Sequence, residues 1–323
     1  MLLDVKNLKI SFHTDKGVFN AVNGISFNIF AGKTLCLVGE SGCGKSVTAL
    51  SLLRLIDKPG KITDGTILLE NKDLVLLSER EMRNVRGKNI SMIFQEPMTS
   101  LNPSYTIGSQ IKEVLRLHKN LKGKDLKDTA INALALVAIP SPKEIMGEYP
   151  FKLSGGMRQR VMIAMAMACS PKLLIADEPT TALDVTIQAQ VLTLIKKLQS
   201  RENTAVLFIT HDLGVVSEVA DDVAVMYMGE IVENGDIQSI FSNPKHPYTQ
   251  GLFYSLPSKG ITKDKSKLFS ISGNVPSIFD LPKGCAFWPR CQYAKSVCKE
   301  NSPLLKDMGD GHYVSCFKAQ GDF

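Results

Sequence analysis

The sequence has 323 residues, of which 44% are hydrophobic and 22% charged, a composition typical of a globular protein with a large core. The longest uninterrupted apolar run, from Val161 to Cys169, is far shorter than the ~20 residues that cross a bilayer. The first residues lack the basic stretch and apolar core of a secretory signal, so we expect a cytosolic chain without a membrane span. The net charge of +6 comes without a long basic run, which disfavours nucleic-acid binding.

Strand-like and helix-like stretches alternate along most of the chain. The expected strands are 34–38, 90–94, 173–176, 205–210 and 223–228, and the expected helices include 45–55 and 186–198. This alternation predicts an α/β fold. Between Ile107 and Met167 the strand signals disappear and the apolar spacing becomes helical, which indicates a helical insertion in the α/β core.

The texture changes after about Gly235, where prolines interrupt the chain repeatedly and cysteines gather. We interpret this region as a small appended domain.

Residues 39–46, with the sequence GESGCGKS, fit the pattern G-x-x-x-x-G-K-[ST] between an apolar strand and a helix-forming run. In such a loop main-chain N–H groups converge on phosphate oxygens at the positive end of the helix. We expect Lys45 to reach the β- and γ-phosphates and the Ser46 hydroxyl to ligate Mg²⁺. A glycine-rich turn without a ligand is the alternative, which the flanking strand and helix disfavour. The expected nucleotide contacts here are Gly39, Ser41, Gly42, Cys43, Gly44, Lys45, Ser46 and Val47.

A second apolar strand, at 172–176, ends in two carboxylates and resembles a Walker B motif. Buried strand residues would hold Asp177 near the Mg²⁺ ion, and Glu178 would stand one residue further, where a general base can orient or deprotonate the attacking water. An acidic pair after a strand is common by itself, but it becomes a strong signal beside the glycine-rich loop.

Residues 153–160, LSGGMRQR, place Ser154, Gly155 and Gly156 at the start of a helical run, where bare N–H groups offer a second phosphate site. A chain with one phosphate loop needs no second one unless it serves a nucleotide bound by another subunit. The sequence thus resembles the ATP-binding subunit of an ABC transporter, whose LSGGQ-type signature closes over ATP held by the partner. Met157 stands where that signature has glutamine.

The resemblance implies roles for further residues. Phe12 lies where an aromatic ring stacks on adenine, although Phe19 is a nearby competitor. Gln95 matches the glutamine that senses Mg²⁺ and water, and with Ser46 and Asp177 it completes the expected Mg²⁺ ligands. Two residues match the remaining motifs of the family, Asp184 in the D-loop and His211 as the histidine that contacts the γ-phosphate. The expected catalytic residues are therefore Glu178, His211 and Gln95.

The implied fold is a P-loop NTPase (RecA-like) core with an antiparallel β subdomain and a helical subdomain at about 98–168, all within an ATPase domain of residues 1–235. Residues 244–252 and 284–291 resemble the tail of the dipeptide and oligopeptide importer subgroup. The same tail occurs in relatives that serve nickel or glutathione, so the cargo stays open. Residues 236–323 would form the C-terminal metal-binding domain.

Four of the seven cysteines lie in this tail with the spacing C-x5-C-x6-C-x17-C, namely Cys285, Cys291, Cys298 and Cys316. In a reducing cytosol a metal is favoured over disulfides. The tight C-x2-4-C hairpins of structural zinc sites are absent, whereas wider spacing suits a [4Fe–4S] cluster. The resemblance favours the cluster, with zinc or unmetallated thiols as alternatives, and the expected role is structural.

The resemblance implies an ATPase that powers import of dipeptides or oligopeptides from the cytoplasmic face of the cell (inner) membrane. Two ATPase domains would face each other head to tail with ATP between them. The expected partners are two membrane-spanning permease subunits, docked near residues 95–98, and a second related ATPase or a copy of this chain, with an extracytoplasmic substrate-binding protein acting indirectly. An ABC ATPase that works on DNA or ribosomes and a non-hydrolysing sensor are less favoured, since the chain has one nucleotide domain, no coiled-coil insertion and intact Glu178 and His211.

Overall fold

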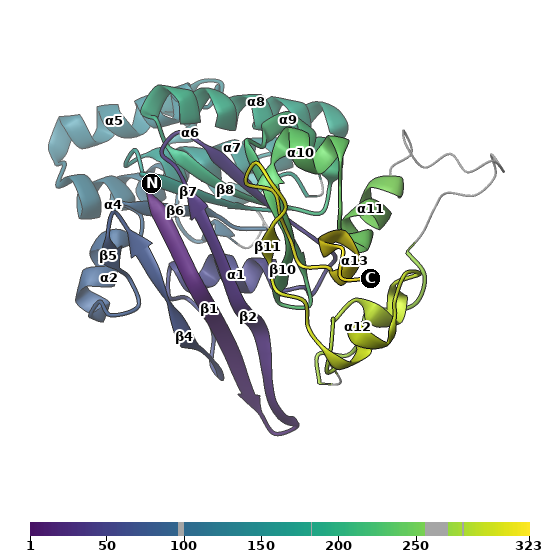
Figure 1. Cartoon of the computed structure of the whole chain (residues 1–323). Coiled ribbons are helices and arrows are strands. Elements are labelled where there is room, and N and C mark those ends of the chain that lie inside the picture. Colours follow the sequence, from purple (N-terminus) through teal and green to yellow (C-terminus); the bar gives the residue numbers. More distant parts are fainter. Residues whose placement is uncertain (96–99, 182, 256–270, 280) are drawn as a thin grey trace. The chain divides into compact units, whose positions relative to one another are not determined.

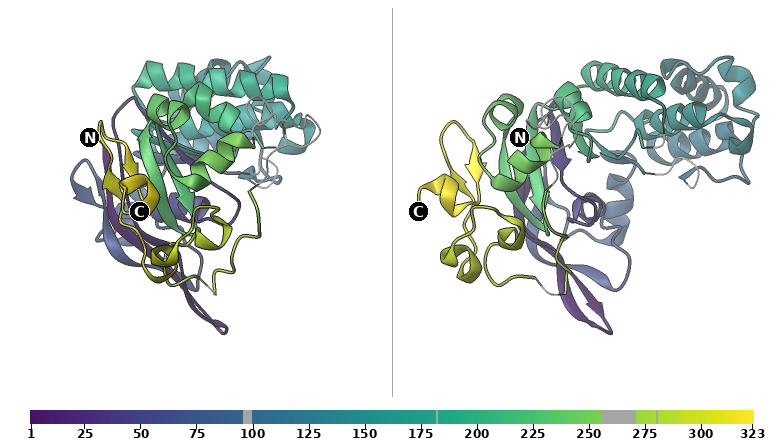
Figure 2. Two further views of the ribbon diagram at one scale, coloured as in Figure 1. Left: turned by 45° about the vertical axis from the view of Figure 1, so that its right-hand side comes forward. Right: turned by 90° about the vertical axis from the view of Figure 1, so that its right-hand side faces the viewer.

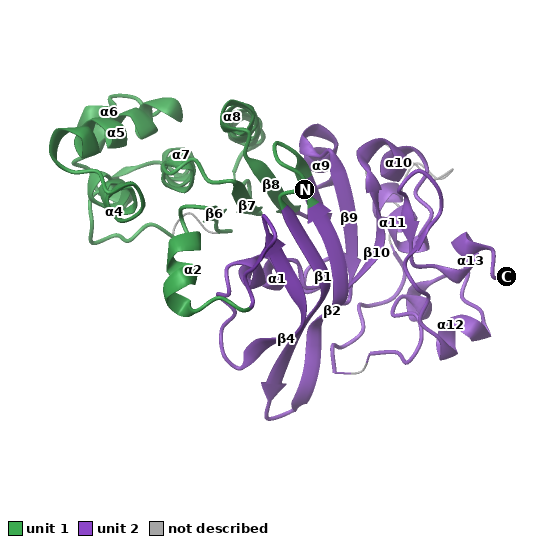
Figure 3. Ribbon diagram, turned by 60° about the vertical axis from the view of Figure 1, so that its left-hand side comes forward, with its two compact units in different colours: residues 1–2, 29–34, 76–209 green, residues 3–28, 35–75, 210–323 purple. Residues whose placement is uncertain are grey.

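The structure is a computed structural model that describes residues 1–95, 100–181, 183–255, 271–279 and 281–323 (Figure 1). These residues form two compact units, which Figure 3 colours separately. Unit 1 comprises the described residues of 1–2, 29–34 and 76–209, and unit 2 those of 3–28, 35–75 and 210–323. Each unit therefore combines segments that lie far apart in the sequence.

In unit 1, β7 (Leu173–Asp177) pairs in parallel with both β6 (Ile90–Ile93) and β8 (Ala205–Thr210). Every residue of β7 and β8 is buried, as expected for parallel strands that are covered on both faces. The predicted strands thus form, and β7 extends one residue beyond its predicted end. That residue is Asp177, which ends the strand with its side chain in the interior.

The helices of unit 1 include the stretch predicted as a helical insertion. They are α2 (Glu79–Val85), α4 (Ile107–Lys119), α5 (Gly123–Leu136), α6 (Pro142–Ile145), α7 (Gly155–Met167) and α8 (Val185–Glu202). Helices α4, α5 and α7 pack against one another, as the green helices of Figure 3 show. Side-chain caps fix several helix starts: Ser78 and Glu81 form a capping box on α2, and the Thr106 hydroxyl accepts the Ser109 N–H on α4.

Unit 2 contains two sheets and two helices before its C-terminal segment. The first sheet is antiparallel, with the order β2 (Gly17–Ile29), β1 (Leu3–Thr14), β4 (Gly60–Leu69) and β5 (Lys72–Asp73). In the second sheet β3 (Thr34–Val38) pairs in parallel with β9 (Asp222–Tyr227), and β9 pairs antiparallel with β10 (Glu230–Asp236). The helices are α1 (Lys45–Leu52) and α9 (Leu213–Val219). The antiparallel sheet implied by the family resemblance is therefore present.

The C-terminal segment, residues 236–323, belongs to unit 2 and extends its second sheet. Its elements are α10 (Ile237–Ser242), α11 (Pro247–Tyr254), α12 (Ser296–Glu300), β11 (Lys306–Asp307), β12 (Tyr313–Val314) and α13 (Phe317–Gln320). Strand β12, yellow in Figure 2, pairs antiparallel with the green β10. The domain boundary between residues 235 and 236 stays a prediction. The segment nevertheless contributes a strand, β12, to the second sheet.

Helices α10 and α11 were not predicted. The prolines between 244 and 257 were interpreted as interruptions, which hid α11. Pro247 instead occupies the first position of α11, where a missing N–H costs nothing and a fixed φ favours the helix. The side chain of Asp236 accepts the N–H groups of Gln238 and Ser239 and so begins α10. Among the described residues, no helix combines the length and apolar character that a membrane span requires.

A buried carboxylate on β10 joins the strand to two parts of the C-terminal segment. Glu233 is fully buried, and its Oε1 lies 2.7 Å from His312 Nε2. The same oxygen accepts the Lys245 N–H at 2.7 Å, and Oε2 accepts the His246 N–H at 3.0 Å. Burial alone raises the pKa of Glu233, but the hydrogen bonds from His312 and the two main-chain amides outweigh it and hold that pKa below its ordinary value.

We expect this carboxylate to make the free energy of unfolding depend on pH. Because its pKa is lowered in the folded chain, the stability it contributes is complete above the unfolded pKa of ~4.3 and is lost as the pH falls through the folded-state pKa. Glu233→Gln should lower the free energy of unfolding by about 2–4 kcal/mol at pH 7. The free energy of unfolding of this variant should also decrease less than that of the wild type as the pH falls.

Urea titrations between pH 3.5 and pH 7, monitored by the protection of the C-terminal segment from proteolysis, measure both effects. Glu300→Gln, at an exposed position of α12, is the matched control. If the wild type and Glu233→Gln lose stability in parallel as the pH falls, the carboxylate does not carry the pH dependence.

Candidate active site

The phosphate loop lies in unit 2 between β3 and α1, as the sequence predicts. Its shape depends on glycine at two positions. Gly44 has φ +103°, and a Cβ there would come 2.5 Å from the Ala21 carbonyl oxygen; at Gly39 a Cβ would come 2.3 Å from the Met226 carbonyl oxygen. Both positions therefore exclude a side chain on steric grounds, whatever the loop binds.

Lys45, the first residue of α1, is buried and points back along the loop. Its Nζ donates hydrogen bonds to the carbonyl oxygens of Gly39 at 2.8 Å and Glu40 at 2.9 Å. The Cys43 Sγ lies 3.6 Å from the same Nζ, and burial raises the pKa of this thiol. An ammonium group held by carbonyl oxygens along the loop is placed to exchange them for phosphate oxygens.

The predicted base and the predicted glutamine meet in unit 1. Gln95 Nε2 donates to Glu178 Oε2 at 2.8 Å, and the Thr181 hydroxyl donates to the same oxygen at 3.0 Å. Glu178 adopts φ +45°, which is uncommon for a residue with a side chain, and its N–H donates to the Ile209 carbonyl oxygen at 2.9 Å. The Glu178 carboxylate, on a backbone conformation that is uncommon for a residue with a side chain, is thus held by Gln95 and Thr181.

The positions of the remaining predicted catalytic and Mg²⁺-binding residues are described within each unit separately. Asp177 ends β7 with 4% of its surface exposed, and His211 is exposed between β8 and α9. Ser46 and Val47 lie in the first turn of α1. Since Ser46 and His211 belong to unit 2 and Asp177, Gln95 and Glu178 to unit 1, the convergence of these residues on one Mg²⁺–ATP stays a prediction.

The signature and D-loop residues occupy helix starts in unit 1. The Ser154 hydroxyl accepts the Met157 N–H and caps α7, and the Asp184 carboxylate accepts the Ile187 N–H and caps α8. A Cβ on Gly156 would come 3.2 Å from Ile187 Cγ2, so this glycine permits the packing of α8 on α7. A Cβ on Gly155 would meet nothing within 4 Å. Packing against the described residues therefore gives no reason for a glycine at 155. Ala182 of the D-loop and residues 96–98 of the predicted docking surface lie outside the described residues.

The two candidate adenine-stacking rings lie together in unit 2. Phe12 and Phe19 stack with their centroids 5.4 Å apart and their planes at 8°. The ring of Phe12 covers Gly60, where a Cβ would come within 2.6 Å of it, and Phe19 contacts the edge of Phe279 at 5.1 Å. The structure thus joins the two candidates in one aromatic stack, and the role of Phe12 in binding adenine stays a prediction.

The four tail cysteines line one small cavity of about 20 Å³ in unit 2. Its walls also include His246, Phe287, Trp288 and Phe317. Burial raises the pKa of the Cys285 thiol to about 12, with the neighbouring cysteines adding to the shift, and burial likewise raises the pKa of Cys291 and Cys316. Among the described residues, however, no three His, Cys, Asp or Glu side chains are grouped closely enough to hold a metal ion. A metal-binding domain is therefore not shown, although its four predicted ligands share a cavity.

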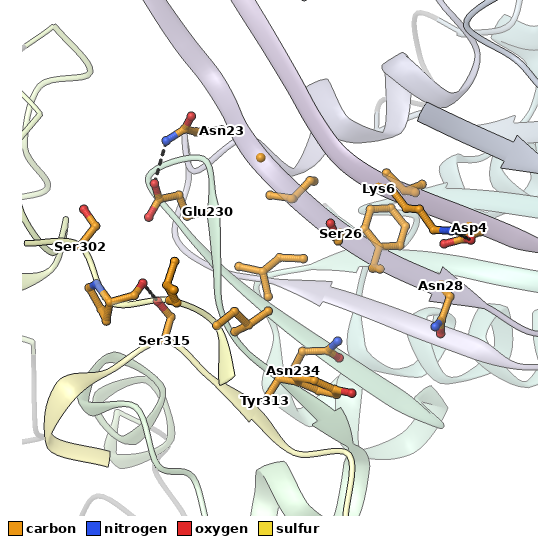
Figure 4. Close-up of a pocket in the computed structure, with 18 residues that line it drawn as sticks. Asp4, Lys6, Asn23, Ser26, Asn28, Glu230, Asn234, Ser302, Tyr313 and Ser315 are labelled. Carbon is orange, nitrogen blue, oxygen red and sulfur yellow. Dashed lines mark hydrogen bonds and ion pairs between the residues drawn. The ribbon is translucent and has the colours of Figure 1, made fainter. Parts of the chain in front are cut away.

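A separate pocket of about 600 Å³ in unit 2 contains none of the predicted site residues (Figure 4). It lies between β2, β10 and the C-terminal segment, with Tyr313 and Asn234 on one side. Asn23 Nδ2 donates to Glu230 Oε1 at 2.8 Å inside it, and burial raises the pKa of Glu230. This pocket lies where the C-terminal segment meets the first sheet of unit 2.

Two residues that hold the site were missed by the sequence analysis. Thr181 donates to the Glu178 carboxylate, and the Tyr248 hydroxyl accepts the N–H of Glu40 in the phosphate loop at 2.9 Å. Thr181 lies three residues after Glu178 in a polar turn, which offers a local signal. Tyr248 lies 208 residues from the loop, so no local pattern connects them.

The phosphate loop before α1 and the signature at the start of α7 have the sequence and the local structure expected of the nucleotide-binding subunit of an ABC-type ATPase. Residues 22–181 match the family described as ABC transporter, and residues 232–298 match the oligopeptide/dipeptide transporter C-terminal region.

Similar proteins support the same classification. The chain is 54% identical to the oligopeptide transport ATP-binding protein AppD of Bacillus subtilis over 98% of this chain and 96% of the relative. It is 52% identical to OppD of the same organism over 99% of this chain and 90% of the relative. The dimeric, post-hydrolysis structure of the ATP-binding cassette MJ0796 with ADP and phosphate has a TM-score of 0.66 at 26% identity, covering 73% of this chain and 99% of that one. The chain belongs to the family of ATP-binding subunits of oligopeptide and dipeptide ABC transporters, and it is an ATPase.

Gly155 gives a test of the second phosphate site. Because a methyl group at 155 fits without a clash, Gly155→Ala should leave the thermal unfolding temperature unchanged or slightly raised. If the N–H groups of this helix start approach a phosphate, the same methyl group should reduce ATP hydrolysis by about tenfold or more. ATPase assays and thermal melts of the full chain measure the two effects.

Gly147→Ala is the matched control, since a Cβ there meets only the Glu144 carbonyl oxygen at an ordinary 3.5 Å. Unchanged hydrolysis in Gly155→Ala would show that no phosphate approaches this residue.

Proposed function

We propose that this chain powers the import of dipeptides or oligopeptides by hydrolysing ATP between two nucleotide-binding subunits. In this mechanism Mg²⁺–ATP is held by Lys45, Ser46 and Asp177 of one subunit and by the signature at 154–156 of the other. Because the γ-phosphate interacts differently with the closed and open dimer, binding closes the pair and hydrolysis releases it. The names of the relatives and the match of the C-terminal region support peptides over nickel or glutathione as cargo.

The observation that carries the proposal is the hydrogen-bonded group of Gln95, Glu178 and Thr181. A general base must be within reach of the water it activates, and a fixed carboxylate meets this need better than a mobile one. Gln95 and Thr181 fix the Glu178 carboxylate, and the amide of Gln95 offers a further oxygen for Mg²⁺ or water. A non-hydrolysing sensor would have no use for this arrangement.

The proposed partners are two permease subunits in the cell membrane and a second ATPase, either related or a copy of this chain. The chain would then lie at the cytoplasmic face of the membrane, and a substrate-binding protein on the other side would deliver the peptide. The dimeric state of the solved cassette supports the pairing of two ATPase subunits.

Affinity purification of the Glu178→Gln chain from detergent-solubilised membranes with ATP tests the assembly. Mass spectrometry should identify two multi-span proteins and a second ATPase. Recovery from the soluble fraction with ribosomes or nucleic acid would overturn the transport proposal and leave the ATPase assignment standing.

Glu178→Gln should also separate binding from hydrolysis. The amide cannot accept the proton of the attacking water, so the hydrolysis rate should fall by about 10²–10⁴-fold, while the affinity for ATP changes by less than threefold. Steady-state phosphate release and equilibrium ATP binding measure the two quantities, with Glu113→Gln on α4 as the control. Hydrolysis that persists in Glu178→Gln would remove this residue from the role of base.

We further propose that Cys285, Cys291, Cys298 and Cys316 hold a [4Fe–4S] cluster, with zinc as the alternative. The donor set supports the proposal: four thiols and a buried histidine share one cavity with aromatic walls. A bound cluster would crosslink α12, α13 and the turn at 285–291, a segment with little core of its own.

The metal content decides between these alternatives. Anaerobically purified full-length protein should be brown and contain about four irons and four sulfides. Replacing any one of the four cysteines with serine should reduce the iron content, whereas Cys169→Ser, at a buried position in unit 1, should not. Colourless protein with one zinc would replace the cluster with zinc, and protein without metal would overturn the site altogether.

A further inference from the structure

An arginine of the C-terminal segment forms a bidentate ion pair with the phosphate loop. Arg290 Nη1 lies 2.6 Å from Glu40 Oε2, and Nη2 lies 3.0 Å from Oε1. The two residues are 250 positions apart in the sequence, and both belong to unit 2. Glu40 directly follows Gly39, the first glycine of the loop.

This ion pair is more buried than a surface salt bridge. The Arg290 side chain is 4% exposed and that of Glu40 29%. The guanidinium lies over the rings of Tyr227 at 5.8 Å and Phe287 at 6.0 Å, and its Nε donates to the Ser272 carbonyl oxygen at 3.2 Å. A planar guanidinium group that stacks on aromatic rings and forms two bonds to a carboxylate has one favoured geometry. The ammonium group of a lysine could not reproduce it.

Glu40 is held at three points, two of which come from the C-terminal segment. Its carboxylate pairs with Arg290, its N–H donates to the Tyr248 hydroxyl, and its carbonyl oxygen accepts from Lys45 Nζ. Tyr248 is fully buried and contacts Tyr227, with ring centroids 4.7 Å apart. The N–H of Glu40 is thus committed to the protein, and the loop is fixed at the residue where it leaves β3.

The charge of Glu40 also needs a partner for reasons of function. A carboxylate in a loop that receives a polyphosphate repels that ligand unless a cation neutralises it. Lys45 contacts the carbonyl oxygen of Glu40 rather than its carboxylate. Among the described residues, Arg290 supplies the cation that the structure pairs with this carboxylate.

We propose that Arg290 is a positioning residue for the phosphate loop, which neutralises and orients Glu40 and thereby sets the affinity for nucleotide. The C-terminal segment is then part of the ATP-binding machinery, although Arg290 itself need not touch the nucleotide. The proposal concerns binding of Mg²⁺–ATP alone and is independent of peptide transport and of the occupant of the cysteine cavity.

A double-mutant cycle on the full chain tests the proposal, with binding of a non-hydrolysable ATP analogue and Mg²⁺ as the readout. Arg290→Met should raise the Kd about tenfold, and Arg290→Lys should raise it about threefold, because lysine keeps the charge and loses the fork. Glu40→Gln should change the Kd by less than threefold. In the Glu40→Gln background, Arg290→Met should add less than twofold, since no carboxylate remains to be neutralised.

Steady-state kinetics provide a readout that a purely structural role would not give. Arg290→Met should raise the KM for ATP and leave kcat at saturating ATP within about twofold. Lys306→Gln, which removes an exposed cation of the same segment, should change neither parameter.

Two results would overturn the proposal. One is an unchanged Kd in Arg290→Met, and the other is an equally large effect of Arg290→Met with and without Glu40→Gln, which would place the action of Arg290 outside Glu40. Should Arg290→Met fail to fold, the same cycle with Arg290→Lys carries the comparison, and additive effects there would overturn the proposal as well.

Discussion

A loop whose N–H groups are to bind phosphate can use few of them to hold itself, and this constraint bears on how the phosphate loop is supported in unit 2. Residues 39–44 lie between β3 and α1 and belong to neither element, so apart from the bond of the Cys43 N–H to the Glu40 carbonyl oxygen their shape comes from glycine sterics and from groups outside them. The steric constraint comes from Gly39 and Gly44, because carbonyl oxygens of neighbouring strands occupy the space that a Cβ would need. The supporting groups are Lys45 and Tyr248, which bind the main chain of Glu40.

The C-terminal segment takes part in this support through three buried polar anchors. Glu233 joins β10 to the start of α11 and to His312, Tyr248 reaches the phosphate loop from α11, and Arg290 reaches it from the tail. The turn that carries Arg290 is bounded by Cys285 and Cys291, which line the cysteine cavity. Burial of these polar groups is tolerated because each of them has hydrogen-bond partners. These partners belong to segments that lie far apart in the sequence.

Sequence patterns predicted what is local and missed what is not. The strands β3 and β8 and the phosphate loop are visible because apolar runs and glycine spacing are properties of neighbouring residues. Helix α11 was missed because a proline breaks a helix in its interior but favours it at the first position. Composition does not show which of these positions Pro247 occupies. The pairing of Arg290 with Glu40 spans 250 residues, so only a folded chain brings them together. The acidic residue inside a phosphate loop was nevertheless a signal, since it required a cation from elsewhere.

Two side chains of the predicted nucleotide site, one in each unit, have hydrogen-bond partners within the chain. Lys45 is buried against two carbonyl oxygens, and the Glu178 carboxylate accepts from Gln95 and Thr181. A buried ammonium group without partners would cost several kcal/mol, so the two carbonyl contacts stabilise Lys45 in its place. On the proposed function, phosphate at Lys45 and water at Glu178 would replace existing hydrogen bonds, so the net gain per contact is modest. Tight binding then depends on how well the loop is already shaped before the exchange, because a pre-organised loop loses little conformational entropy when it binds.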